Sequence, residues 1–279
     1  MNGVNYFKKT YRIINKFLLI FFAKILAQPL KPLGLMIVPS YDKIKNFKFN
    51  YSKLSRRLIF YPKKEESFNK IYIDNSLNYS FLCKIGSTKY PTAKSPYAEW
   101  HRCGYTGLYN LLFSSFRDKK INFAEIGVET NDSIKMWREF FSQATIHAFE
   151  FFDEKIQRAK EDNLKNTFYH KINVRDKEDI IKSFKKTNSK FDIIIDDSTH
   201  DFEDQINIIT HCNQFLEKNG ILIIEDISKS RKGYSELDYY NSLKDIKNLF
   251  NEIVFIETKH VNNFSANYKF EKILILIKQ

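Results

Sequence analysis

The chain has 279 residues, of which 43% are hydrophobic and 28% charged, a composition that excludes a disordered or fibrous protein. Its formal net charge of +12 comes from residues 1–70, which hold 15 Lys and Arg against 3 Asp and Glu, so residues 71–279 are formally neutral. This distribution excludes a basic nucleic-acid groove that extends over the whole fold. The three cysteines form no C-x-x-C pair, which favours a reducing, cytoplasmic location.

Residues 1–40 are expected to form a basic amphipathic helix followed by a proline-rich turn. Lys8, Arg12 and Lys16 recur at four-residue spacing among apolar residues, and three prolines follow. Such a helix is typical of a protein that is peripheral to the inner face of a membrane, with residues 1–27 on the anionic surface. The alternative is a helix that packs on its own domain or on a second subunit of a homo-oligomer. No spanning helix is expected, because a lysine interrupts the best apolar run.

Residues 41–100 are expected to form a linker, a lid or a substrate-facing subdomain, with a weak strand at 70–73. Residues 101–279 alternate between short apolar runs and helical patterns, which predicts an α/β domain with a doubly wound, mostly parallel sheet. The expected strands are 121–126, 145–150, 167–172, 191–196, 221–225, 252–257 and 272–277, and the expected helices are 133–141, 155–163, 177–185, 202–216 and 240–250.

Ligands of such sheets bind beyond the carboxyl ends of the strands, so polar residues that end an apolar run are candidates for the site. Glu125 and Gly127 end one run and precede a predicted helix. Glu150 ends the next run 25 residues later, about where an acid that binds a ribose is expected. Together they suggest a nucleoside-bearing cofactor, although a strand, turn and helix without a ligand would look much the same.

Two further strand ends are more acidic. Asp196 and Asp197 end one buried run, with His200 three residues on, and Glu225 and Asp226 end the next. Burying such a cluster requires a compensating cation, and oxygen ligands favour Mg²⁺, Mn²⁺ or Ca²⁺ over Zn²⁺. His200 beside that cation is a candidate general base. The alternative is that the acids cap helices and that His200 lies on a solvated rim.

These motifs resemble a known family. Glu125-Ile-Gly-Val, Ser133-Ile-Lys-Met-Trp137, Asp196-Asp-Ser-Thr-His200 and Glu225-Asp-Ile, together with Gly104-Tyr-Thr-Gly-Leu-Tyr109, are similar to the class I S-adenosylmethionine-dependent methyltransferases. The resemblance is to the Mg²⁺-dependent sugar O-methyltransferases, a group related to the cephalosporin hydroxylase-like proteins, and covers roughly residues 100–279. It implies a Rossmann-like sheet of seven strands with an antiparallel C-terminal hairpin.

The resemblance also implies roles for individual residues. Asp197 and His200 would be catalytic, with His200 as the base that deprotonates a sugar hydroxyl. The metal ion, Mg²⁺ or Mn²⁺, would bind Asp197, Glu225 and Asp226. S-adenosylmethionine would bind Glu125, Gly127 and Ser133 through its methionine part, Glu150 through its ribose and Asp176 near its adenine, with Asp196 also in the cofactor site. This chain departs from the family at Asn131 and Asp132, where glycine is usual, and in its D-D-S-T-H motif, which is usually D-D-G-S-H.

The sequence therefore predicts a metal-assisted O-methyltransferase that acts on a sugar or glycan precursor. One alternative is a non-catalytic, membrane-associated protein that retains the methyltransferase fold. The other is an RNA methyltransferase that uses the basic residues 1–70, although nucleic acid is not the expected partner.

Overall fold

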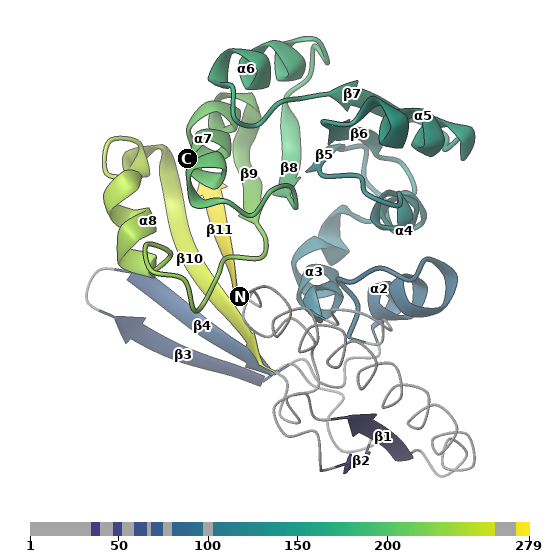
Figure 1. Ribbon diagram of the computed structural model, residues 1–279, viewed down its shortest axis with the longest axis vertical. Helices are drawn as coiled ribbons and strands as arrows, with labels where there is room; N and C mark the ends of the chain where they lie inside the picture. The colour runs from purple at the N-terminus through teal and green to yellow at the C-terminus, as the bar shows by residue number, and fades with distance from the viewer. Residues whose placement is uncertain are drawn as a thin grey trace, which may run out of the picture.

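The computed structural model describes residues 80–96, 103–259 and 272–279, and four strands before them (Figure 1). The amphipathic helix expected from the N-terminal sequence lies outside the described residues. β1 (Leu35–Pro39) and β2 (Phe47–Tyr51) form an antiparallel pair. β1 therefore occupies the last residues of the segment in which a proline-rich turn was expected. None of the helices that the structure describes is long and apolar enough to cross a membrane.

The main sheet has nine strands in the order β3-β4-β10-β11-β9-β8-β5-β6-β7. Seven of them come from the domain expected to be catalytic. Within this domain, the five strands β5 to β9 run parallel to one another. β11 runs antiparallel to both β9 and β10, which confirms the expected seven-stranded sheet with an antiparallel C-terminal hairpin. The seven strands are β5 (Asn122–Ile126), β6 (Thr145–Glu150), β7 (Thr167–Lys171), β8 (Phe191–Asp196), β9 (Leu216–Ile224), β10 (Phe250–Lys259) and β11 (Lys272–Lys278).

The two remaining strands come from the segment expected to be a linker or lid. β4 (Phe68–Asp74) pairs parallel with β10, and β3 (Ile59–Glu65) pairs antiparallel with β4. An ion pair of 2.7 Å between Lys70 and Glu236 joins β4 to the helix α8 (Glu236–Ser242). Part of residues 41–100 is therefore an extension of the sheet, because β10 has an edge that the weak strand at 70–73 can pair with.

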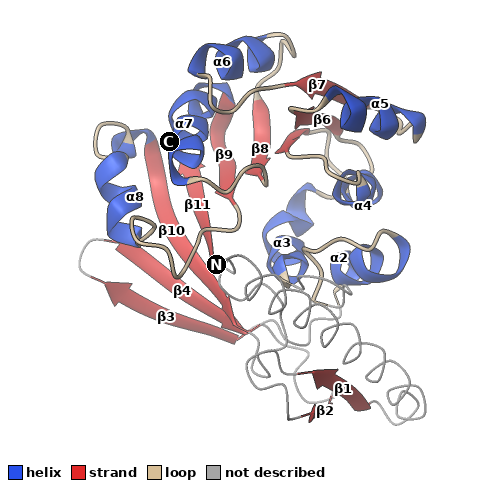
Figure 2. Cartoon of the chain, viewed as in Figure 1, coloured by secondary structure: helices blue, strands red, loops and turns tan. Residues whose placement is uncertain are grey.

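Helices cover both faces of the sheet (Figures 1 and 2). They are α2 (Phe81–Lys84), which continues into the π-helix η2 (Ile85–Lys89), α3 (Tyr105–Phe113), α4 (Asp132–Phe140), α5 (Asp153–Glu161), α6 (Lys177–Lys185), α7 (Phe202–Cys212) and α8 (Glu236–Ser242). Short 3₁₀ segments lie at Ser114–Phe116, Asn213–Phe215 and Lys247–Leu249. The helix expected at 240–250 was wrong, because a capping box between Ser235 and Asp238 starts α8 earlier.

Side chains point alternately to the two faces of the sheet, and each face has its own hydrophobic core. Phe123 of β5 and Ile195 of β8 pack on the face that α3 and α4 cover. Their neighbours Ala124 and Ile194 pack on the opposite face, with α6 and α7. Because successive strand side chains point to opposite faces, this alternation also decides which acids at the strand ends can meet.

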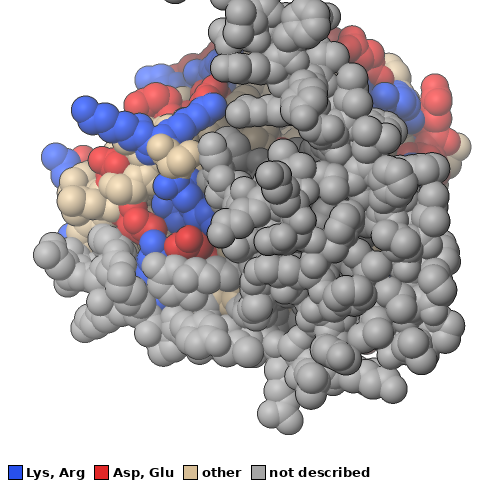
Figure 3. Space-filling model, turned by 60° about the horizontal axis from the view of Figure 1, so that its bottom comes forward, with Lys and Arg blue, Asp and Glu red and all other residues tan. Residues whose placement is uncertain are grey.

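Charged side chains of both signs lie next to one another where described residues are visible in Figure 3. This mixture is what a formally neutral domain is expected to present.

Candidate active site

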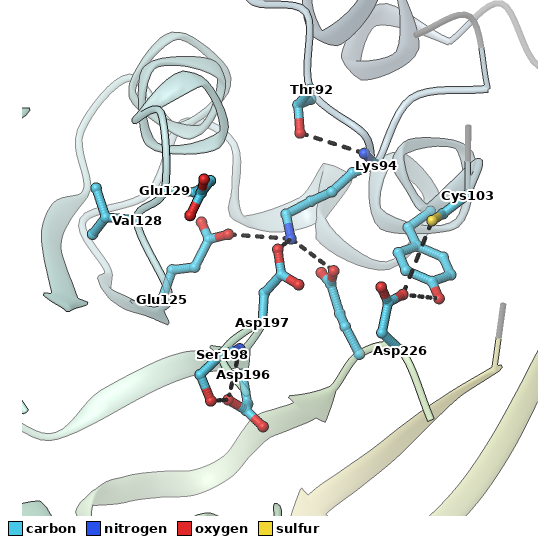
Figure 4. Close-up of polar contacts among 12 residues, drawn as sticks. Thr92, Lys94, Cys103, Glu125, Val128, Glu129, Asp196, Asp197, Ser198 and Asp226 are labelled. Atoms are coloured by element: carbon cyan, nitrogen blue, oxygen red, sulfur yellow. Dashed lines mark hydrogen bonds and ion pairs between the residues drawn. The ribbon is translucent and has the colours of Figure 1, made fainter. Parts of the chain in front are cut away.

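Four carboxylates meet at the carboxyl edge of the sheet. Glu125 is the penultimate residue of β5, and Asp197 follows β8 (Figure 4). Glu225 and Asp226 follow β9. Glu125 and Glu225 are almost completely buried, whereas the side chain of Asp197 is 30% exposed. Three adjacent strands thus bring together three of the four acids predicted as a cluster, Asp197, Glu225 and Asp226, and Glu125 takes the place expected for Asp196.

Lys94 lies at the centre of these acids. Its ammonium nitrogen is 2.5 Å from Asp197 Oδ2, 2.7 Å from Glu225 Oε2 and 3.2 Å from Glu125 Oε1. Its side chain is 3% exposed. Burial alone would lower the pKa of Lys94, but the three carboxylates hold it well above its usual value, so the nitrogen remains a cation. The cation expected among these acids was a divalent metal ion, and Lys94 was not among the candidate residues.

Two tyrosines of α3 also donate to the cluster. Tyr105 Oη is 2.8 Å from Asp226 Oδ1, and Tyr109 Oη is 2.7 Å from Glu225 Oε1. Burial and the neighbouring carboxylates raise the pKa of both phenols well above the usual value, so they stay protonated donors. The Gly104 to Tyr109 motif therefore serves the acidic cluster, because one helical turn places both hydroxyls on the same face.

His200 faces two of the four acids. Its Nε2 lies 3.9 Å from Asp197 Oδ1 and 3.9 Å from Asp226 Oδ2, and its backbone has a φ of +59°. Asp197, His200 and Asp226 offer ligand atoms that all lie within 4.8 Å of one another. Carboxylate oxygens are the donors that suit Mg²⁺ or Mn²⁺, so Asp197 and Asp226 fit a divalent cation, with His200 beside it.

Glu225 differs from the expectation that it is a metal ligand. Its two oxygens accept from Lys94 and from Tyr109, which leaves neither directed at the group formed by Asp197, His200 and Asp226. Burial, together with the other carboxylates, raises the pKa of Glu225 against the opposing effect of Lys94. Of the three expected metal ligands, only Asp197 and Asp226 belong to this group, and Glu225 does not.

A cavity of about 340 Å³ opens next to the cluster. It lies beyond the ends of β5, β6 and β8, where a sheet of this type binds its ligand. Asp197 belongs both to its wall and to the acidic cluster. The cavity is lined by Ile126, Gly127, Glu129, Phe149, Glu150, Phe151, Phe152, Lys155, Ile172, Asn173, Val174, Arg175, Asp197, Ser198 and Thr199.

Gly127 and Glu150 shape this cavity. Gly127 has a φ of +103°, and a Cβ atom on it would lie 2.1 Å from the backbone oxygen of Asp197, so only glycine fits. Glu150 accepts four backbone N–H groups, two from the loop after β5 at Val128 and Glu129 and two from Phe151 and Phe152. Glu150 therefore fixes the loop after β5 and the loop after β6 relative to each other at the cavity wall.

Four of the six residues assigned to the cofactor do not line the cavity, namely Glu125, Ser133, Asp176 and Asp196. Glu125 belongs instead to the acidic cluster around Lys94. Asp176 is exposed and caps α6 by accepting from the N–H groups of Glu178 and Asp179. Asp196 points away from Lys94 (Figure 4) and bonds to Ser198, because alternation turns it to the opposite face from Asp197. Ser133 lies in the first turn of α4 and hydrogen-bonds to Glu125 of the acidic cluster. The cofactor role of these residues stays a prediction, and strand alternation in the sequence already indicates that Asp196 and Asp197 point to opposite faces.

Asn131 takes the place of the expected glycine without crowding the cavity. Its φ is +69°, the left-handed region that Asn tolerates. Its amide group points toward α5 and β7, where it donates to Asp162 Oδ2 at 2.9 Å and accepts from Tyr169 Oη at 3.0 Å. The side chain is buried there and is absent from the cavity wall.

Comparison with known proteins decides the family. A model described as a methyltransferase domain matches residues 123–272, which is more than half of the chain. The chain belongs to this methyltransferase family. The match begins at β5 and ends at the start of β11, so it includes Glu125, Glu150, His200 and both acids after β9.

Two curated relatives come from Streptomyces olivaceus. They are 8-demethyl-8-alpha-L-rhamnosyl tetracenomycin-C 2'-O-methyltransferase, 24% identical over 141 residues, and 8-demethyl-8-(2-methoxy-alpha-L-rhamnosyl)-tetracenomycin-C 3'-O-methyltransferase, 25% identical over 143 residues. The alignments cover 47% and 48% of this methyltransferase chain. The chain spans about a third of the length of these relatives, 35% and 34%.

A similar solved structure is the MycE methyltransferase from the mycinamycin biosynthetic pathway, in complex with Mg, SAH and mycinamycin VI. It is 17% identical, with a TM-score of 0.54, over 71% of this chain and 53% of MycE. A second MycE structure, with Mg and SAH, gives a TM-score of 0.53 at 18% identity over 71% and 55% of the two chains. These similarities confirm the expected methyltransferase fold.

Proposed function

We propose that this chain is an S-adenosylmethionine-dependent, divalent-metal-assisted O-methyltransferase that acts on a sugar or glycan hydroxyl. The observation that carries the proposal is the double position of Asp197, which lines the cavity and also faces His200 and Asp226. A methyl donor in the cavity and a hydroxyl at the acidic cluster would meet there. Such alignment of two reactants is the main requirement of a methyl transfer.

The cavity side of the site fits the donor. S-adenosylmethionine supplies an electrophilic methyl group when it is bound. Gly127 lets the loop after β5 pack closely on the backbone of Asp197 at the cavity wall, and Glu150 presents a buried carboxylate from the end of β6. Phe149, Ile172 and Val174 contribute apolar wall, which is suited to a nucleoside base.

The acidic side fits the acceptor. A divalent cation here would be held by Asp197 and Asp226 and would lower the pKa of a bound hydroxyl. His200 Nε2 would take the proton of that hydroxyl, since its distance of 3.9 Å from both carboxylates leaves it outside a hydrogen bond with either. The same carboxylates would then stabilise the imidazolium that forms.

The names of the relatives support a sugar hydroxyl as the acceptor. Both Streptomyces olivaceus enzymes are named for O-methylation on a rhamnosyl compound, and the MycE structure contains Mg and SAH. Because this chain spans about a third of those relatives, the acceptor assigned to it is a sugar hydroxyl in general rather than the compounds that they methylate.

The proposal is tested with S-adenosylhomocysteine, Mn²⁺ and methyl α-L-rhamnopyranoside as probes. We expect wild-type protein to bind the first two in isothermal titration. His200→Ala should abolish methyl transfer to the rhamnoside and leave both affinities within about threefold, because a base is not needed for either ligand. Folded wild-type protein that binds neither probe would contradict an enzymatic function and would favour a non-catalytic role.

We also propose that the protein is cytoplasmic and peripheral to the membrane, on the basis of the basic N-terminal pattern alone. Full-length protein should sediment with vesicles that contain phosphatidylserine. Replacing Lys8, Lys9, Arg12 and Lys16 with Gln should release it, since each basic residue near an anionic surface contributes about 1 kcal/mol. Equal sedimentation with and without these charges would refute the membrane role.

A further inference from the structure

We propose that Lys94 is a positioning residue that withholds Glu225 from the divalent cation and limits the carboxylate ligands of the cation to Asp197 and Asp226. This inference rests on the proposed function, since it concerns the cation of the same site. It differs from the ligand set that the sequence motifs imply, in which Glu225 is a ligand.

The hydrogen-bond inventory of the acids is the first support. An ammonium group has three N–H donors, and the three carboxylates within 3.2 Å of Lys94 Nζ are those of Asp197, Glu225 and Glu125. Both oxygens of Glu225 accept a strong donor, Oε2 from Lys94 and Oε1 from Tyr109 at 2.7 Å. Glu225 is also absent from the group of ligand atoms within 4.8 Å of one another that Asp197, His200 and Asp226 form.

The two aspartates are engaged differently. Asp197 gives Oδ2 to Lys94, and Asp226 gives Oδ1 to Tyr105. The second oxygen of each lies 3.9 Å from His200 Nε2. One oxygen of each aspartate is therefore directed to a common point beside the histidine, where a cation would find both of them.

The burial of Lys94 and Glu125 makes it unfavourable for a metal ion to displace Lys94 from Glu225. Among the described residues, Lys94 is the one cation that forms an ion pair with Glu125, whose side chain has 0% exposure. A metal ion that displaced Lys94 to reach Glu225 would leave Glu125 as an unpaired buried charge, which is strongly unfavourable. The two positive charges would also repel each other at such short range.

The backbone around Lys94 fixes its position. The carbonyl of Lys94 accepts from the N–H of Thr106 at 3.1 Å, and the N–H of Thr92 bonds to the carbonyl of Gly86 at 3.0 Å. Residues before the methyltransferase match thus supply the lysine from a segment tied to α3 and η2. An ammonium group held in this way acts as a permanent monovalent cation beside the divalent one.

The test is a double-mutant cycle on Mn²⁺ affinity, measured by electron paramagnetic resonance with Mn²⁺ alone. We expect Glu225→Gln in the wild-type background to change the dissociation constant by less than about threefold. Lys94→Met should tighten Mn²⁺ binding about tenfold or more, since it frees a carboxylate that can coordinate. Glu225→Gln added to Lys94→Met should remove that gain, and Asp226→Asn, the positive control, should weaken binding at least about tenfold.

Two outcomes would overturn the inference. One is a loss of Mn²⁺ affinity of more than about tenfold in Glu225→Gln alone, which would make Glu225 a ligand. The other is an unchanged affinity in Lys94→Met. If Lys94→Met does not fold, Lys94→Met combined with Glu125→Gln keeps the net charge and still frees Glu225, so the same gain is expected from it.

Failure here is distinguishable from failure of the proposed function. Wild-type protein that binds S-adenosylhomocysteine and Mn²⁺ but depends on Glu225 for Mn²⁺ would refute only the role of Lys94. Wild-type protein that binds neither ligand would refute the methyltransferase activity itself.

Discussion

Asn131 offers a quantitative test of how this chain replaces a glycine next to its cavity. The residue has a left-handed backbone and a buried amide group that bonds to Asp162 and Tyr169. Asn131→Gly keeps the backbone free of strain and loses these hydrogen bonds. Asn131→Ala loses the same hydrogen bonds and adds the steric cost of a Cβ atom in the left-handed region.

The magnitudes follow from the contacts. A hydrogen bond to a charged group contributes about 1.5–3 kcal/mol, but Asp162 is 34% exposed and also pairs with Lys135 at 2.9 Å. We therefore expect Asn131→Gly to lower the free energy of unfolding by about 1–2 kcal/mol. Asn131→Ala should lower it by about 1 kcal/mol more, because of its backbone strain.

The assay is urea unfolding together with titration of S-adenosylhomocysteine. Asn188 provides a matched control, since it is exposed and also has a left-handed backbone, with a φ of +51°; Asn188→Gly should change stability by less than about 0.5 kcal/mol. Cofactor affinity should stay within about threefold in Asn131→Gly, because the side chain points away from the cavity. A stabilised Asn131→Gly variant, or one that binds S-adenosylhomocysteine tenfold more tightly, would refute this reasoning.

Three further predictions concern residues around the sheet. Gly127→Ala should lower the free energy of unfolding by more than about 3 kcal/mol in urea unfolding, because its Cβ would meet the Asp197 backbone. Gly233→Ala is the control: Gly233 has a φ of +88°, and a Cβ on it would have no atom within 4 Å. This variant should lower the free energy of unfolding by only about 1 kcal/mol. Burial and then His170 lower the pKa of His147 to about 4. Below pH 6.5, His147 binds a proton in the unfolded chain but stays neutral in the folded protein. The free energy of unfolding should therefore fall by about 1–2 kcal/mol from pH 7 to pH 5, and His147→Phe should remove this loss. Asp176→Ala should destabilise the protein by about 1 kcal/mol through its lost cap and leave S-adenosylhomocysteine affinity unchanged; a tenfold weaker affinity would restore its place near the adenine.

Much of the fold was predictable from local pattern. Short apolar runs that alternate with helical periodicity indicated the parallel sheet, and strands β5 to β11 lie close to the predicted ranges. Most of the acidic cluster was predictable for a related reason, since carboxyl ends of parallel strands share one edge. Asp197, Glu225 and Asp226 lie there as expected, and Glu125, which was assigned to the cofactor, joins them.

Other site features depend on side-chain direction. Asp196 and Asp197 are adjacent in sequence, yet alternation sends them to opposite faces, so only Asp197 reaches the cavity and the cluster. Asp176 follows β7 as a cofactor residue would, but its carboxylate is used by the first turn of α6. A residue type at a strand end therefore predicted the region of the site more reliably than the role of each side chain.

By itself, the sequence determined the layers of this methyltransferase fold and the need for a cation among its buried acids, because periodicity and charge burial act over short stretches of chain. Only the tertiary structure decided which cation is held among those acids. Lys94 lies 103 positions before Asp197 and 131 before Glu225 along the chain, in a segment without a recognisable motif. No local pattern encodes a contact of that separation, and the fold creates it by docking one turn of chain on the edge where three strands end.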